Sequence, residues 1–166
     1  MKWYYKNIDR QRTYSRELAR KRMAERIEPL EKAGIKFKGG NTRIKGINEA
    51  KLYYIVTNLF PDDKPIRNDR LTLGGLELDV YLPSLKLAFE YMGQYHYLFN
   101  IDNPWPLKTL EEFEALQWRD KRKRELCKEK GIILIDVKYD EEITHELILN
   151  KLKECDITTK EIKEPI

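Results

Sequence analysis

The spacing of apolar residues changes from helical to strand-like in the middle of the chain, and this change is the strongest indication of the fold class. Three strand-like segments follow one another closely, over residues 66–73, 75–82 and 86–92. The breaks between them are as short as Gly74-Gly75 and Pro83-Ser84, which is typical of antiparallel strands joined by tight turns. Helical spacing then returns over residues 109–130 and leads into a short apolar run at 132–137, which suits a buried strand. This order predicts an α/β fold with one mixed β-sheet flanked by helices.

Helical patterns also occupy both ends of the chain. Apolar residues recur at helical spacing over residues 13–33, 47–60 and 141–154. We expect the first helix to stop at Gly34 and a turn to follow at Gly39-Gly40-Asn41, while Pro104 and Pro106 indicate a loop over residues 97–107. The expected organisation is a basic helical extension over residues 1–44, a core domain over 45–156 and a frayed tail over 157–166.

Positive charge is concentrated in the first third of the chain. Residues 1–50 carry 14 Lys and Arg against 6 Asp and Glu, whereas residues 140–166 carry 4 against 8. A basic segment with interleaved aromatic residues is typical of a surface that binds a polyanion such as DNA, although a solvated basic helix explains the charge equally well. The side chains expected to contact DNA phosphates are Arg12, Arg16, Arg20, Lys21, Arg22 and Arg26.

Length and composition exclude several classes of protein. The 166 residues suit one ordinary domain or one domain with appendages. No window approaches the roughly 18 uninterrupted apolar residues that a membrane span needs. The first residues lack a signal-peptide pattern, so we expect a soluble, cytoplasmic protein with no membrane partner. Cys127 and Cys155 stand alone without CxxC spacing, which excludes a zinc ribbon or zinc finger and predicts packing roles for both thiols.

Two acidic residues interrupt apolar strands. Asp79 lies in LELDVYLP and Glu90 lies in LAFEYMG. Because side chains alternate along a strand and the turn at residues 83–85 is tight, the two carboxylates can lie side by side across the hairpin. A carboxylate pair in an apolar sheet needs a compensating cation, and hard oxygen ligands suit Mg²⁺ or Mn²⁺. Glu49, near the start of the 47–60 helix, is a third acid that could approach this site. Ordinary salt bridges to Arg or Lys are the alternative interpretation of Asp79 and Glu90.

A set of motifs spans the predicted hairpin: RNDR at 67–70, GGLELDVYLP at 74–83 and EYMGQYHY at 90–97. Together they resemble the core of the PD-(D/E)XK, restriction-endonuclease-like nuclease superfamily. The similarity is greatest to the branch that contains very-short-patch-repair-type nucleases and EDxHD homing endonucleases. Residues 119–132 resemble the helix and closing strand that follow the site in that branch. The match covers about residues 45–140 and is specific as a set rather than piece by piece.

The resemblance implies metal-dependent DNA cleavage on a restriction-endonuclease-like core, with Mg²⁺ or Mn²⁺ as the cofactor. Asp79 matches the aspartate of the first motif and Glu90 the acid of the second, so these two would hold the metal. Glu49 matches the glutamate of the preceding helix. His96 falls where this branch often has a histidine, which assists as a base or orients the water. Since double-strand cleavage by one small site usually needs two copies, we expect either a homodimer or sequential nicking.

One position departs from the superfamily pattern. The lysine usually found two residues after the second acid is replaced by Met92, which carries no charge and donates no strong hydrogen bond. Gln94 and Lys123 are the candidates for supplying the missing catalytic group.

The predicted 109–130 helix carries a further group of polar residues. Gln117, Asp120 and Lys123 are three residues apart, so they share one broad helix face that could point at the site. A solvated charge run is the alternative interpretation of this stretch. Arg119 and Arg122 on the same helix are further expected DNA contacts.

The function expected from these patterns is a metal-dependent DNA endonuclease that hydrolyses phosphodiester bonds. Met92 favours an alternative, a catalytically inactive nuclease-fold module that binds nucleic acid or takes part in assembly, whereas the retained Asp79, Glu90 and His96 argue against it. A nuclease directed at RNA or at branched structures would share the same site.

Overall fold

The computed structural model describes residues 2–32, 46–99, 107 and 109–157. Contacts within the chain divide it into two units, Met1–Ala50 and Lys51–Ile166, and the division falls inside the helix α2 (Ile47–Leu59). The turn expected at residues 34–41, most of the 97–107 loop and most of the 157–166 tail lie outside the described residues.

The first unit contains α1 (Lys2–Lys32), a helix of 31 residues. The helix begins well before residue 13, so the expected start is wrong. Residues 2–12 lack the apolar spacing that marks a packed helix, but they contain neither Gly nor Pro and include several Lys, Arg and Gln, which favour helix. Intrinsic propensity therefore extends the helix beyond its apolar pattern.

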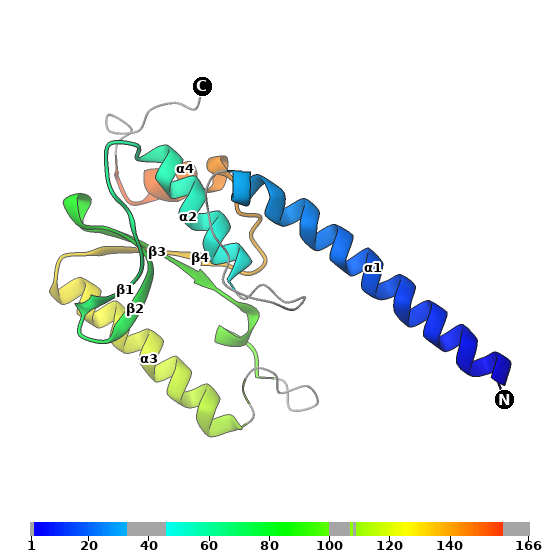
Figure 1. Ribbon diagram of the computed structural model, residues 1–166. Coiled ribbons are helices and arrows are strands. Elements are labelled where there is room, and N and C mark those ends of the chain that lie inside the picture. Colours follow the sequence, from blue (N-terminus) through cyan, green and yellow to red (C-terminus); the bar gives the residue numbers. More distant parts are fainter. Residues whose placement is uncertain (1, 33–45, 100–106, 108, 158–166) are drawn as a thin grey trace. The chain divides into compact units, whose positions relative to one another are not determined.

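The second unit is built on a four-stranded sheet with the strand order β1-β2-β3-β4 (Figure 1). The strands are β1 (Ile66–Leu73), β2 (Leu76–Leu82), β3 (Leu87–Met92) and β4 (Ile133–Lys138). The first three strands pair antiparallel and β4 pairs parallel to β3, with the helix α3 (Leu110–Glu129) between them in sequence. The predicted mixed sheet flanked by helices is confirmed.

Local sequence signals explain the turns and helix starts. Gly74 and Gly75 both have positive φ, which favours glycine, and they close the turn between β1 and β2. A short 3₁₀ helix, η1 (Pro83–Leu85), joins β2 to β3. The last helix, α4 (His145–Glu154), begins later than the expected residue 141, because the Thr144 hydroxyl caps it by accepting a hydrogen bond from the Leu147 N–H.

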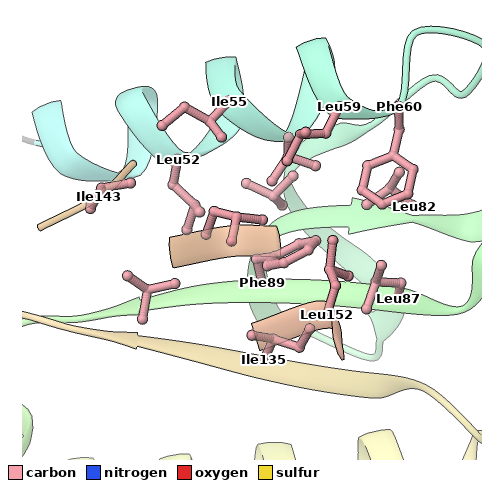
Figure 2. Close-up of a cluster of buried hydrophobic side chains, with 14 residues drawn as sticks. Leu52, Ile55, Leu59, Phe60, Leu82, Leu87, Phe89, Ile135, Ile143 and Leu152 are labelled. Carbon is pink, nitrogen blue, oxygen red and sulfur yellow. The ribbon is translucent and has the colours of Figure 1, made fainter. Parts of the chain in front are cut away.

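Two apolar clusters pack the helices against the two faces of the sheet. One cluster joins α2, α4 and the sheet (Figure 2), and its members include Leu52, Ile55, Leu59, Leu82, Leu87, Phe89, Ile135 and Leu152. The other cluster joins α3 to the opposite face and includes Leu78, Tyr81, Ala88 and Cys127. The packing roles predicted for the two thiols are confirmed, because Cys127 is buried in the second cluster and the partly buried Cys155 packs against the first.

Within the described residues, no helix combines the length and the apolar character required to cross a membrane.

Candidate active site

Asp79 and Glu90 face each other across the β2–β3 hairpin. Val80 pairs with Phe89 in this hairpin, so the antiparallel register brings Asp79 opposite Glu90. Glu90 Oε1 accepts a hydrogen bond of 3.0 Å from the Asp79 N–H, and Asp79 Oδ2 accepts one of 2.8 Å from the Tyr91 N–H. By alternation along the strands, both carboxylates lie on the face that α3 covers, together with Ala88. The expected side-by-side arrangement is present.

The Glu90 carboxyl group is held in an unfavourable setting for a negative charge. Its residue is only 4% exposed. Burial and then the charge of Asp79 raise the pKa of Glu90 to about 7, although Lys123 and the Asp79 N–H favour the ionised form. Near neutral pH this carboxyl group therefore exchanges a proton easily, and any added cation would favour its charged form.

Lys123 supplies a positive charge to this pair from α3. Its ammonium nitrogen lies 2.6 Å from Glu90 Oε2, and both side chains are largely buried. Met92, which stands in the position of the missing lysine, is buried at the end of β3. The other candidate, Gln94, is exposed at the start of the 3₁₀ helix η2 (Gln94–His96). Of the two residues proposed to replace the missing lysine, Lys123 is the one that contacts the acid.

His96 forms a second polar contact with α3. Its Nδ1 lies 2.7 Å from Asp120 Oδ2, and both side chains are mostly buried. The Gln117 side-chain amide donates a hydrogen bond to the His96 carbonyl oxygen. Gln117, Asp120 and Lys123 thus share one face of α3, and all three contact strand or η2 residues. The alternative of a solvated charge run is wrong for Asp120, which is buried, and for Lys123, which is largely buried, whereas Gln117 is exposed.

Asp136 extends the acidic row and was missed as a site residue from the sequence. The parallel register pairs Glu90 with Asp136 of β4, so Asp79, Glu90 and Asp136 lie on three adjacent strands. Asp136 Oδ2 accepts a hydrogen bond of 2.8 Å from Arg124 Nη2, while Asp136 Oδ1 is buried with no hydrogen-bond partner among the described residues. The available signal was an acid inside the apolar run IILIDV, the same signal that identified Asp79 and Glu90.

The remaining predicted acid and helix cations have less definite roles. Glu49 lies in the first turn of α2, within the unit that ends at Ala50, so its approach to the acidic pair stays a prediction. Arg119 is exposed on α3. Arg122 is paired with two glutamates of its own helix, Glu125 at 3.4 Å and Glu129 at 3.2 Å.

The predicted DNA contacts of α1 lie on the described helix. Arg16, Arg20, Lys21 and Arg22 are exposed, whereas the side chains of Arg12 and Arg26 lie outside the described part of the chain. Exposed cations along a helix suit contacts with phosphates, and their role stays a prediction.

The donor chemistry of the acidic pair fits a small divalent cation. In the described part of the chain, no three His, Cys, Asp or Glu side chains gather closely enough to hold a metal ion by themselves. Mg²⁺ commonly takes only one or two protein carboxylates and completes its shell with water and substrate phosphate. Asp79 and Glu90 offer such a pair. Burial and the charge of Asp79 raise the pKa of Glu90, and a bound cation would offset both effects.

Two curated viral proteins are similar to this chain. Over 123 residues, which are 74% of this chain and 57% of the relative, it is 32% identical to uncharacterized protein 307L of Invertebrate iridescent virus 6. Over 82 residues, which are 48% of this chain and 40% of the relative, it is 38% identical to uncharacterized protein 033L of Invertebrate iridescent virus 3. The chain therefore spans little more than half of the first relative and two fifths of the second. No family model and no solved structure matches the chain.

Proposed function

We propose that this chain is a metal-dependent DNA endonuclease whose second unit is a restriction-endonuclease-like core. The observation that carries the proposal is the Asp79–Glu90 pair: two carboxylates from adjacent strands, opposite in register, with one pKa raised to about 7. A largely buried lysine beside this pair, and a histidine held by a buried aspartate, add the polar groups that phosphodiester hydrolysis needs.

Asp79 and Glu90 are the residues that would hold Mg²⁺ or Mn²⁺ in this proposal. When bound, such an ion lowers the pKa of a water molecule and stabilises the negative charge that develops on the phosphate. Lys123 donates a hydrogen bond to Glu90 and favours its ionised form, against the burial and the Asp79 charge that raise its pKa to about 7.

His96 is the proposed proton acceptor. When Nδ1 donates its hydrogen to Asp120, the neutral imidazole carries its lone pair on Nε2, which can take a proton from an attacking water. Asp120 orients the ring and stabilises the imidazolium that forms. Gln117 holds the backbone of His96 from the same helix, so the group is positioned by α3 as a whole.

The exposed cations of α1 are the proposed source of sequence-independent DNA affinity. Arg16, Arg20, Lys21 and Arg22 can neutralise phosphates and release counterions, which predicts affinity that falls with salt. A homodimer would bring two sites to one duplex, whereas a monomer would nick one strand at a time.

The test of this function is nicking of supercoiled plasmid with Mg²⁺ or Mn²⁺. The wild-type chain should convert supercoiled DNA to open circles, and Asp79→Asn should lose this activity by at least about 100-fold, a loss typical of removing catalytic groups. Asp140→Asn, which removes a charge from an exposed position, is the matched control and should nick as the wild type does. Equal behaviour of Asp79→Asn and the wild type would refute the endonuclease.

One observation favours the second candidate, a nuclease-fold module that binds DNA without cleaving it. The Lys123 ammonium already neutralises Glu90 at 2.6 Å, so the pair can be stable without a metal ion. The same plasmid assay, run beside a DNA-binding assay, separates the candidates: binding without nicking would favour the module.

A further inference from the structure

Arg124 is anchored beside the acidic pair. Its Nη2 donates a hydrogen bond of 2.8 Å to Asp136 Oδ2, and Asp136 pairs in register with Glu90 on the neighbouring strand. Adjacent strands lie about 4.8 Å apart. Asp136, which holds the guanidinium group, is therefore one strand spacing from Glu90 and two from Asp79.

Two aspartates of the candidate site, Asp136 and Asp120, act on the charge of Arg124. Burial alone would lower its pKa, but the hydrogen bond and charge of Asp136 outweigh burial, and Asp120 and Tyr97 add to the same effect, so the pKa of Arg124 is raised. Asp120 is the partner of His96. Arg124 thus forms an ion pair with Asp136 of the acidic row and lies one helical turn from Asp120, the partner of His96.

The side chain of Arg124 is more exposed to solvent than that of the preceding residue, Lys123. Its side chain is 48% exposed although it is anchored, whereas that of Lys123 is 17% exposed and committed to Glu90. The bond to Asp136 uses one of the five N–H donors of a guanidinium group. A planar guanidinium group matches the geometry of phosphate oxygens, and anchoring it in advance reduces the entropy lost on binding.

The balance of charges around Arg124 also favours a phosphate as its ligand. Asp79, Glu90 and Asp136 form a row of three carboxylates, and the two consecutive cations Lys123 and Arg124 each pair with one of them. A phosphate would be repelled by this row unless an exposed cation met it. Arg124 is the exposed member of the two.

We propose that Arg124 is a substrate-binding residue that holds a backbone phosphate next to the scissile phosphodiester, with Asp136 as the residue that positions it. This inference rests on the proposed nuclease function, which makes a nucleic-acid backbone the substrate. The contact between Arg124 and a neighbouring phosphate is an addition to that function.

The test measures binding rather than cleavage. The full chain, in EDTA so that no divalent ion is present, is titrated against a short fluorescein-labelled DNA duplex by fluorescence anisotropy at several salt concentrations. Arg124→Gln should raise Kd about tenfold, because a charge-assisted hydrogen bond to phosphate is lost. It should also make the slope of log K against log salt shallower by about one.

Arg70→Gln is the matched control. It removes the same type of exposed side chain, but Arg70 lies on β1, is paired with Glu77 at 2.6 Å and is not one of the predicted DNA contacts, so Kd should stay within about twofold of the wild type. Asp136→Asn keeps the Arg124 cation but weakens the hydrogen bond that positions it, so its Kd should lie between those of the two arginine variants. Equal Kd values for Arg124→Gln and Arg70→Gln, or a wild-type chain that binds no duplex, would overturn the inference.

Circular dichroism melting checks that each variant folds. Should Arg124→Gln fail to fold, Arg124→Lys keeps the ion pair with Asp136 and takes its place. This variant should still bind several-fold more weakly, because lysine lacks the guanidinium fork, and an unchanged Kd would overturn the inference. The nuclease function is tested by a different measurement, plasmid nicking. If the wild-type chain nicked no plasmid but Arg124→Gln still bound DNA more weakly than the wild type, the nuclease function would fail and the phosphate contact of Arg124 would be supported.

Discussion

Lys123 on α3 and Glu90 on β3 form an ion pair between residues 33 positions apart, with 2.6 Å between Nζ and Oε2. The nuclease superfamily that the sequence resembles has a lysine two residues after the second acid, on the same strand, and Met92 occupies the corresponding position of this chain. A helix that crosses the face of the sheet can supply the charge instead, because electrostatic compensation depends on distance in space. The ion pair also joins α3 to the sheet beside the Cys127 cluster.

Removing Lys123 should destabilise the protein in a pH-dependent manner. Lys123→Met leaves the buried Glu90 carboxylate unpaired, so the free energy of unfolding should fall by about 3 kcal/mol near pH 8. The loss should be smaller near pH 5, where Glu90 is protonated and needs no counter-ion. Urea denaturation at both pH values measures the difference, and Lys121→Met at an exposed position of the same helix is the control. An equal loss at both pH values would contradict the role assigned to this ion pair.

Glu90 should make the protein less stable as pH rises. Its pKa is raised from 4.5 to about 7 in the folded state, so the native state binds this proton more tightly than the unfolded chain does. The resulting stabilisation is fully present below about pH 4.5 and is lost as pH rises through 7, a change of about 3 kcal/mol. Glu90→Gln lacks this proton equilibrium. The free energy of unfolding of Glu90→Gln should therefore increase relative to that of the wild type as pH rises from about 4.5 to above 7. A constant difference between the two would show that the pKa of Glu90 is not raised.

A divalent cation should stabilise the wild-type chain more at high pH than at low pH. Ligation needs ionised Asp79 and Glu90, and Glu90 loses its proton only near pH 7. At about 100 times Kd, a bound ion contributes about 2.7 kcal/mol, which corresponds to a rise of about 5–10 °C in Tm. Differential scanning calorimetry with Mg²⁺ or Mn²⁺ near pH 8 and pH 5.5 measures this. Asp79→Asn should abolish the shift, and a similar shift in that variant would exclude the proposed ligands.

The hairpin half of the candidate site could be predicted from the sequence. Acids at Asp79 and Glu90 break apolar strands of period two, and the short connection between the strands leaves few registers that bring both carboxylates to one face. These signals are local, because alternation and turn length act over a few residues. The mixed sheet could be predicted for the same reason, since short turns join β1, β2 and β3 and the helix α3 leads to β4. The place of β4 beside β3 rather than β1 is known only from the structure.

For the residues of α3, the sequence predicts which ones share a helix face but not which strand residues they contact. Spacing puts Gln117, Asp120 and Lys123 on one side of α3, but which strand residue each one meets depends on how α3 crosses the sheet. The Arg124–Asp136 pair is a consequence of that crossing and leaves no trace in either segment alone. The start of α1 was missed because its first residues are helical by propensity and not by pattern.

The hydrogen bond that caps α4 should contribute measurably to the free energy of unfolding. The Thr144 hydroxyl accepts a 3.1 Å hydrogen bond from the Leu147 N–H, which satisfies one of the otherwise unpaired donors of the first turn. Thr144→Ala should lower the free energy of unfolding by about 1 kcal/mol. Thr144→Ser keeps the hydroxyl and is the control, with an expected change well below this. If both variants lost the same stability, the methyl group rather than the cap would be responsible.

His96 and Asp120 should act as one unit in catalysis. Asp120→Asn keeps the shape of the side chain but accepts the Nδ1 hydrogen less strongly, so nicking of supercoiled plasmid should slow by about 10- to 100-fold with little change in KM. His96→Ala should slow it at least as much. Because Asp120 works through the imidazole, the double variant should be no slower than His96→Ala alone, since residues that act as a unit are not additive. Multiplied losses in the double variant would instead indicate that Asp120 contributes independently of His96, for instance through its interaction with Arg124.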